Sequence, residues 1–184
     1  DVGTTGAALG TITITSADQV LFAETVTAAS FTQSAAAATG LTTLDGAVDL
    51  TGAFAFTGQS LTLNAALDSG STVAITNAGQ FTTAADGDIT ATGTVTQTGT
   101  GTNRLAGDIT TTDSDITLGG ATTLTGDVTM STGAGAGTIT LGGTVDSDAT
   151  AQALTLTAGS GNVVFESGAN VGATAALASL AVTG

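Results

Sequence analysis

Short runs in which apolar or β-branched residues alternate with threonine recur along the whole chain. This period of two is typical of half-buried strands, and Gly, Asp, Asn or Ser separates one run from the next. The sequence therefore predicts an all-β chain of many short strands. The runs are 11-TITIT-15, 60-SLTLN-64, 72-TVAIT-76, 88-DITAT-92, 94-TVTQT-98, 108-DITTT-112, 115-DITL-118, 138-TITL-141, 154-LTLT-157 and 162-NVVF-165.

Helix signals are weak, because Thr and Gly are both poor helix formers. The one candidate is the alanine run 35–38, and its neighbours Thr39 and Gly40 do not extend it. We expect no helix to organise the fold.

A longer phrase repeats in the C-terminal half. Each copy holds a strand, a Gly/Ser/Asp turn, a second strand that ends in a glycine-containing corner, and a third short strand. The copies span 107–125, 126–147 and 153–172. The alignment makes Ile109, Val128 and Leu154 equivalent, and likewise Ile116, Ile139 and Val163. The period is elastic, at about 19 to 27 residues, as expected when corners vary in length.

Such a phrase predicts a β-solenoid, in which stacked coils bury a face that one coil cannot bury alone. At roughly 23 residues per coil, the chain makes about eight coils of roughly three short strands each. We expect one array over 1–184, with looser repeats in 1–85 and clearer repeats in 86–184. A β-sandwich is the alternative, although it would usually carry larger core aromatics and more Asp-Gly hairpin turns.

The C-terminal phrases in 107–147 and 153–184 resemble repeats of large bacterial surface proteins, the filamentous-haemagglutinin-like and autotransporter-like β-strand-repeat adhesins. The resemblance implies a right-handed parallel β-helix, a place outside the bacterial cell or on its surface, and a role as stalk, adhesin or fibre. It implies no catalytic or ligand-binding residue.

The composition argues against several classes of function. The chain has no His, Cys, Pro, Trp or Tyr, and Arg104 is its only cationic side chain against 15 carboxylates, for a net charge of −14. Nucleic-acid binding needs clustered Lys or Arg, and the usual catalytic triads and zinc sites need His or Cys. We therefore expect no enzyme and no nucleic-acid partner. No apolar run reaches the roughly 20 residues that span a bilayer, so we expect no membrane insertion.

Three Asp-x-Asp pairs are the candidate metal ligands. Residues i and i+2 of an extended segment point the same way, so two carboxylates could share one Ca²⁺. All three pairs fall at predicted corners. The alternative to calcium binding is that these aspartates only cap turns. The pairs are Asp86 and Asp88, Asp113 and Asp115, and Asp146 and Asp148. Calcium is the one cofactor that the sequence suggests.

Thr-x-Thr rows are the second candidate surface. A flat, regular array of threonines on one solenoid face is the kind of surface that ice-binding β-solenoids use. Threonine is also the simplest polar residue for an exposed strand face, and the rows fall on different strands of the phrase. The rows are 11–15, 94–98, 110–112, 138–140 and 155–157.

The sequence thus predicts a non-catalytic structural repeat protein, secreted or on the cell surface, that forms part of an adhesin stalk or an extracellular fibre. Asp1 at the start, with neither Met nor a basic leader, indicates a processed product or a segment of a longer chain. Neither 11–15 nor 180–184 carries a polar cap, so the expected partners are copies of the chain or flanking repeats, stacked end to end. The alternative function is a calcium-binding or ice-binding module.

Overall fold

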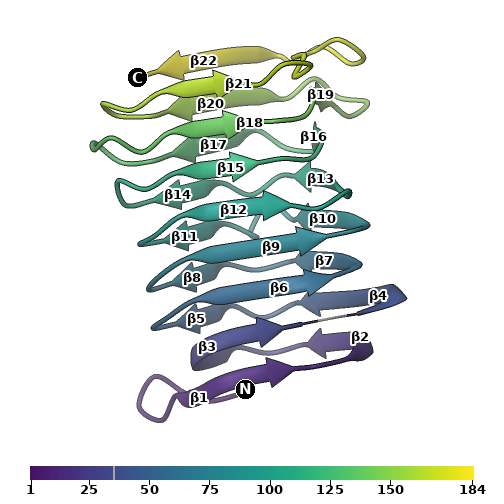
Figure 1. Cartoon of the computed structure of the whole chain (residues 1–184), viewed down its shortest axis with the longest axis vertical. Helices are drawn as coiled ribbons and strands as arrows, with labels where there is room; N and C mark the ends of the chain where they lie inside the picture. The colour runs from purple at the N-terminus through teal and green to yellow at the C-terminus, as the bar shows by residue number, and fades with distance from the viewer. Residues whose placement is uncertain (35) are drawn as a thin grey trace.

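Each alternating run forms a strand that pairs with the equivalent run one coil earlier and one coil later. In the computed structural model, which describes residues 1–34 and 36–184, every pairing between named strands is parallel. The described residues contain no helix and form a right-handed β-solenoid of about eight coils (Figure 1). The predicted parallel β-helix is confirmed. The β-sandwich alternative, which needs antiparallel neighbours, is wrong.

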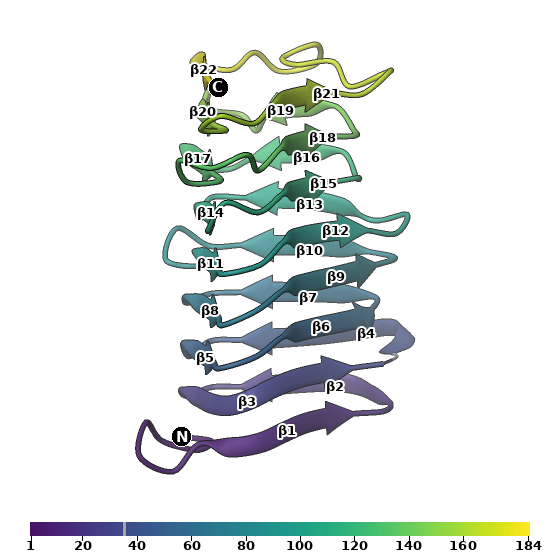
Figure 2. The same cartoon turned by 60° about the vertical axis from the view of Figure 1, so that its left-hand side comes forward.

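Three faces run along the rod (Figure 2). Face 1 contains β5 (Val48–Leu50), β8 (Leu67–Ser69), β11 (Ile89–Ala91), β14 (Ile109–Thr111), β17 (Val128–Ser131), β20 (Ala153–Thr157) and β22 (Ser179–Thr183). Face 2 contains β1 (Leu9–Ile14), β6 (Phe54–Gly58), β9 (Val73–Asn77), β12 (Val95–Thr98), β15 (Ile116–Leu118), β18 (Ile139–Leu141) and β21 (Val163–Phe165). Face 3 contains β2 (Ala17–Phe22), β4 (Ala36–Leu44), β7 (Ser60–Leu63), β10 (Gln80–Thr83), β13 (Thr102–Leu105), β16 (Thr122–Leu124) and β19 (Val145–Ser147).

One long strand, β3 (Val26–Gln33), belongs to two faces. Its first residues pair with β5 on face 1, and its last residues pair with β6 on face 2. Because β3 does not break at the corner, faces 1 and 2 are hydrogen-bonded into one 15-stranded sheet, while face 3 is a separate sheet of seven strands.

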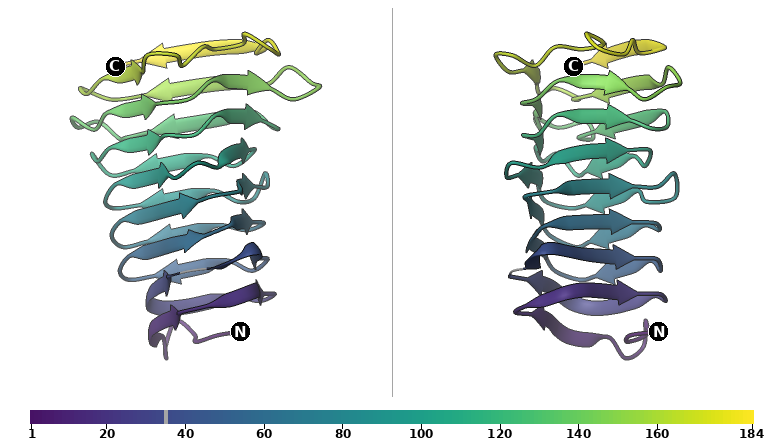
Figure 3. Two further views of the ribbon diagram at one scale, coloured as in Figure 1. Left: turned by 45° about the vertical axis from the view of Figure 1, so that its right-hand side comes forward. Right: turned by 90° about the vertical axis from the view of Figure 1, so that its right-hand side faces the viewer.

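The length of a coil varies at its corners and leaves the ladders intact. Val48 stacks on Leu67, 19 residues on, whereas Val128 stacks on Leu154, 26 residues on. Both stacked pairs have their side chains inside. The side views show coils of unequal width stacked in parallel (Figure 3).

The predicted equivalences are confirmed except for one. Ile116, Ile139 and Val163 form one column, and Val128 pairs with Leu154. Ile109, however, pairs with Met130 and not with Val128. The corner after β17 has seven residues (132–138), against four (112–115) after β14, and β17 sits two residues out of the predicted register. A shift of two keeps the same side chains inside.

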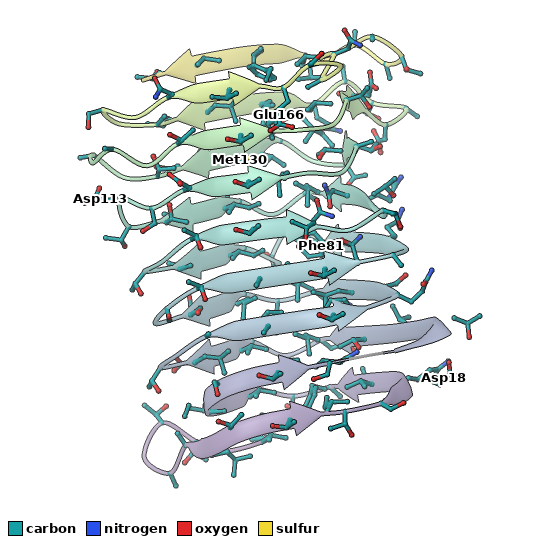
Figure 4. All side chains as sticks on the ribbon, in the orientation of Figure 1. Asp18, Phe81, Asp113, Met130 and Glu166 are labelled. Atoms are coloured by element: carbon teal, nitrogen blue, oxygen red, sulfur yellow. The ribbon has the colours of Figure 1, made fainter. Side chains whose placement is uncertain are left out.

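The interior consists of side-chain columns, one residue per coil. The inward column of face 2 contains Ile12, Phe31, Phe54, Val73, Val95, Ile116, Ile139 and Val163. The rings of Phe31 and Phe54 stack with centroids 4.9 Å apart and an interplanar angle of 11°. Figure 4 shows Phe81 and Met130 inside the rod in the same way; both are buried. The fully buried aromatic rings thus lie in the N-terminal half of the core. Aliphatic residues dominate the rest, where Phe165 of the last coil is partly buried.

The helix candidate 35–38 falls mostly on β4. Residues 36–38 lie within this strand, which pairs in parallel with β2 and β7, whereas residue 35 lies outside the described residues. Tertiary pairing overrides the local helix preference of alanine here.

Replacing Phe54 by Ala tests the stacked core. Phe54 is 0% exposed, so the variant should lose about 3–5 kcal/mol of unfolding free energy through lost burial and a cavity. Urea unfolding followed by circular dichroism measures the loss. The neighbouring variant Ala55→Ser, on the outer side of the same strand, should change the free energy by less than about 0.5 kcal/mol. Equal effects of the two variants would contradict the assignment of Phe54 to the interior.

Candidate functional site

The six candidate calcium ligands lie at three separate places on the rod. One pair, Asp86 and Asp88, occupies the corner between β10 and β11, and a second, Asp113 and Asp115, the corner between β14 and β15. Asp148 follows β19 at a corner, but Asp146 lies within β19 on face 3, so its predicted corner position is wrong. Within 1–34 and 36–184, no group of three or more His, Cys, Asp or Glu side chains is arranged to hold a metal ion. A calcium site would therefore rest on a pair of carboxylates, and it stays a prediction.

Several aspartates bind the backbone of the next coil. Oδ1 of Asp88 accepts a hydrogen bond from the backbone N–H of Asp108 at 2.7 Å, and Oδ1 of Asp108 accepts one from the N–H of Thr129 at 2.7 Å. Three successive coils are joined in this way. Equivalent bonds run from Thr138 N to Asp115 (2.7 Å), from Ala153 N to Asp127 (2.8 Å) and from Thr174 N to Asp146 (2.8 Å). A carboxylate acceptor gives a stronger bond than a neutral one, so these contacts hold the corners in register.

Asp113 makes the same kind of bond from an unusual backbone conformation. It is the one non-glycine residue with positive φ (54°) among those described, and its Oδ1 accepts the N–H of Gly135 at 2.5 Å. A Cβ at Gly135 would lie 2.4 Å from Cγ of Asp113, so only glycine fits there. Figure 4 shows Asp113 at the outer corner. The side chain of Asp113 therefore fastens its own turn to the turn of the next coil through the backbone N–H of Gly135.

The outward column of face 2 contains Thr13, Thr32, Ala55, Ala74, Thr96, Thr117, Thr140 and Val164, one residue per coil. Three consecutive coils of this column carry a partly exposed threonine, and face 3 has an equal run at Thr43, Thr62 and Thr82. The predicted rows 11–15, 94–98 and 138–140 lie along this face, whereas 110–112 and 155–157 begin on face 1. On face 1 the outward column also holds Asp49 and Asp68, which interrupt it with charge.

A chain of buried amides crosses the interior beside the corner between faces 2 and 3. Nε2 of Gln97 donates to Oδ1 of Asn77 at 2.6 Å, and Nδ2 of Asn103 donates to Oε1 of Gln97 at 3.1 Å and to Oγ1 of Thr122 at 3.2 Å. Gln97 and Asn77 are fully buried, and Asn103 is 1% exposed. We call Asn77, Gln97, Asn103 and Thr122 the amide ladder. The sequence analysis missed it, although a polar residue at an inward position of an alternating run was the available signal.

The outer surface of the same corner is hollowed. A groove of about 370 Å³ runs over the ends of β3, β6, β9 and β12, and we call it the corner groove. Its lining carries no charged residue. The lining side chains that can form hydrogen bonds include Ser34, Thr57, Gln59, Thr76 and Thr100.

Both end coils leave the side-chain columns partly open. Inward residues that are only partly buried belong to the first and last coils: Val2, Ile12, Ile14 and Phe22 at one end, and Val163, Phe165, Val171 and Leu177 at the other. On β22, Leu180 stacks on Leu154 and Val182 on Leu156, yet they are 44% and 51% exposed because no further coil covers them. Figure 1 shows β1 and β22 at opposite ends of the stack.

Comparison with known proteins adds no family. The chain matches no protein-family model, no curated protein and no solved structure. No helix among the described residues is long and apolar enough to cross a membrane.

The pair Asp86 and Asp88 separates a structural role from calcium binding. Asp88→Ala removes the acceptor of the Asp108 N–H and should cost about 1 kcal/mol of unfolding free energy, since the bond is exposed to water. Asp86→Ala should be neutral, because the carboxylate of Asp86 takes no part in these cross-coil bonds. Thermal unfolding with and without millimolar Ca²⁺ measures both effects. If the pair binds calcium, Ca²⁺ should raise the Tm of the unmodified chain, and both variants should show a smaller increase. A Tm of the unmodified chain that is the same with and without calcium would contradict the metal prediction.

Proposed function

We propose that this chain is a non-catalytic structural unit of an extracellular rod: a segment of a bacterial surface adhesin stalk, or a subunit of an extracellular fibre. The observation that carries the proposal is the pair of open end coils on an otherwise closed solenoid. Coils stack by nearest-neighbour contacts alone, so an uncovered coil is a template for the next one.

The two ends match in chemistry and geometry. On face 2, β1 presents Ile12 and Ile14 to the column that β21 ends with Val163 and Phe165. Strands at both ends run in the same direction, so a second copy placed head to tail would continue the parallel ladder and extend each column. Heterologous contacts of this kind generate filaments when the rotation does not close a ring.

Charge opposes the same contact. Asp1, Asp18 and Glu24 belong to the first coil and Glu166 to the last, while the whole chain carries a net charge of −14. Repulsion between exposed charges falls as salt shortens the screening length from about 10 Å at 0.1 M to about 3 Å at 1 M. End-to-end association should therefore strengthen with ionic strength.

The residue inventory supports a mechanical role. With no His, Cys or Lys, the chain lacks the side-chain imidazole, thiol and amine groups that most often act as bases and nucleophiles, and its hydroxyls have no such base to activate them. Continuous backbone ladders along the rod and a threonine-rich surface suit a stiff, water-exposed spacer.

Self-association is tested on β22, where inward and outward residues alternate. The chain should form end-to-end oligomers whose size rises with concentration and salt in sedimentation velocity, and rods in negative-stain electron microscopy. Leu180→Asp with Val182→Asp should abolish them, because the inward columns would end in charge. The matched pair Ala181→Asp and Thr183→Asp, outward on the same strand, should assemble at high salt.

Two results decide between the two forms of the proposal. Monomers under every condition contradict the fibre subunit and leave the stalk, in which flanking coils of the natural polypeptide cover both ends. A natural polypeptide without flanking coils, together with a monomeric chain, would overturn the proposal altogether.

The threonine array on face 2 supports ice binding as a second candidate function. Strands about 4.8 Å apart place hydroxyl and methyl groups in a regular outward lattice, and Thr96, Thr117 and Thr140 occupy consecutive coils without a charge between them in that column. A regular neutral array of this kind can order a layer of water.

Thermal hysteresis measured by nanolitre osmometry tests this candidate. The unmodified chain should depress the freezing point below the melting point, and Thr96→Tyr with Thr117→Tyr should remove most of the gap by breaking the flat array. The matched pair Thr90→Tyr and Thr110→Tyr, outward on face 1, should retain it. The absence of thermal hysteresis at millimolar protein concentration would contradict ice binding.

A further inference from the structure

We propose that the corner groove binds a short neutral oligosaccharide. The inference is independent of end-to-end assembly, since the groove lies on the side of the rod and contains no residue of either end coil.

The groove exists because neighbouring corners differ in length. One residue, Gln59, joins β6 to β7, and two residues join β9 to β10, so these tight corners form the floor. Three residues (99–101) join β12 to β13, with Gly99 at φ 102°, and this longer corner forms one wall. On the other side Ser34, directly after β3, completes the lining.

The size of the hollow suits a small chain of sugar rings. Its volume of about 370 Å³ falls within the range of about 300–1,000 Å³ that is usual for small-molecule sites. The lining comes from four successive coils, so the groove is about 14 Å long, three steps of about 4.8 Å. A linear trisaccharide can lie along it.

The chemistry of the lining selects a neutral, hydroxyl-rich ligand. The hydroxyls of Ser34, Thr57, Thr76 and Thr100 each donate and accept, and the amide of Gln59 does both. Sugar hydroxyls have the same dual character. No cation lines the groove to pair with an acidic sugar, and the net charge of −14 repels one; no carboxylate lines it to hold a cation.

Small residues supply the apolar part of the contact. Gly58, Ala78 and Gly99 lie among the hydroxyls and leave flat surface for the C–H face of a sugar ring. No aromatic side chain is among the lining residues, so affinity should be weak, with a Kd on the order of 1 mM.

The groove is preorganised by the amide ladder beneath it. Nδ2 of Asn77 donates to the carbonyl of Gly79 at 2.9 Å, which fixes the floor. The N–H of Gly101 donates to the carbonyl of Asn77 at 3.0 Å, which ties the wall to that floor. Binding then loses little backbone entropy, which favours even a weak ligand.

Titrations followed by ¹H–¹⁵N NMR test the proposal with the unmodified full chain. Probes are maltotriose, cellotriose and triacetylchitotriose, with trigalacturonate as the acidic counterpart and a neutral Gly-Ser peptide as a non-sugar control. At least one neutral sugar should shift the amides of Thr57, Thr76, Ala78 and Thr100 with a millimolar Kd. Trigalacturonate and the peptide should bind about tenfold more weakly or not at all.

A charge placed in the groove provides the matched comparison. Ala78→Glu fills the exposed floor and should weaken sugar binding by about tenfold or more, whereas Ala149→Glu, the same change at an exposed corner elsewhere, should leave it unchanged. Circular dichroism confirms that both variants fold. No shift with any of the three neutral sugars, equal binding by both variants, or tighter binding of the peptide would overturn the proposal, whatever the outcome of the assembly experiments.

Discussion

The parallel stacking of one coil on the next is the interaction on which the rest of the structure depends. A single coil of three short strands has no partner for its backbone groups and no second layer for its inward side chains. Once stacked, each strand donates and accepts along the rod, and each inward residue rests on its equivalent, as Val95 does on Val73 and Ile116 on Val95. Stability is therefore shared between neighbours and is lowest where a neighbour is missing, at the two end coils.

This constraint governs the strands strictly and the corners loosely. A strand must keep its inward residues inside, so β17 departs from the predicted alignment by two residues and not by one. The pairing of β2 with β4 contains an irregularity between Ala17 and Gln19, in the first coils of the rod. A corner only has to connect one strand to the next, and a longer corner adds little to the entropic cost of closing the loop. Both the corner groove and the turn closed by Asp113 arise where corner lengths differ between adjacent coils. Distinct local features can thus appear on a nearly uniform scaffold.

The same contrast explains what the sequence could predict. Alternation in runs such as 60–64 and 138–141 specifies strand and inward side together, so the parallel coils and the column Ile116, Ile139 and Val163 followed from it. Asp146 was misplaced because an aspartate on an outward strand position looks like one in a turn. The amide ladder and the groove depend on which residues of separate coils become neighbours, and the corner lengths that decide this carry no periodic signal.

The amide ladder also affects how such an array can grow. Gln97 hydrogen-bonds Asn77 of the preceding coil and Asn103 of its own coil, and Asn103 donates to Thr122 of the next coil. Oδ1 of Asn103 is buried without a partner. Duplicating or deleting a coil at this point would leave further buried amide atoms without theirs, at a cost of about 1–3 kcal/mol. A coil outside the ladder, such as the one built on Ile139, accepts an inserted copy of itself without any such loss. Recombination is thus free to multiply the C-terminal coils, whose phrases remain alike, while the middle of the rod is locked to a fixed order.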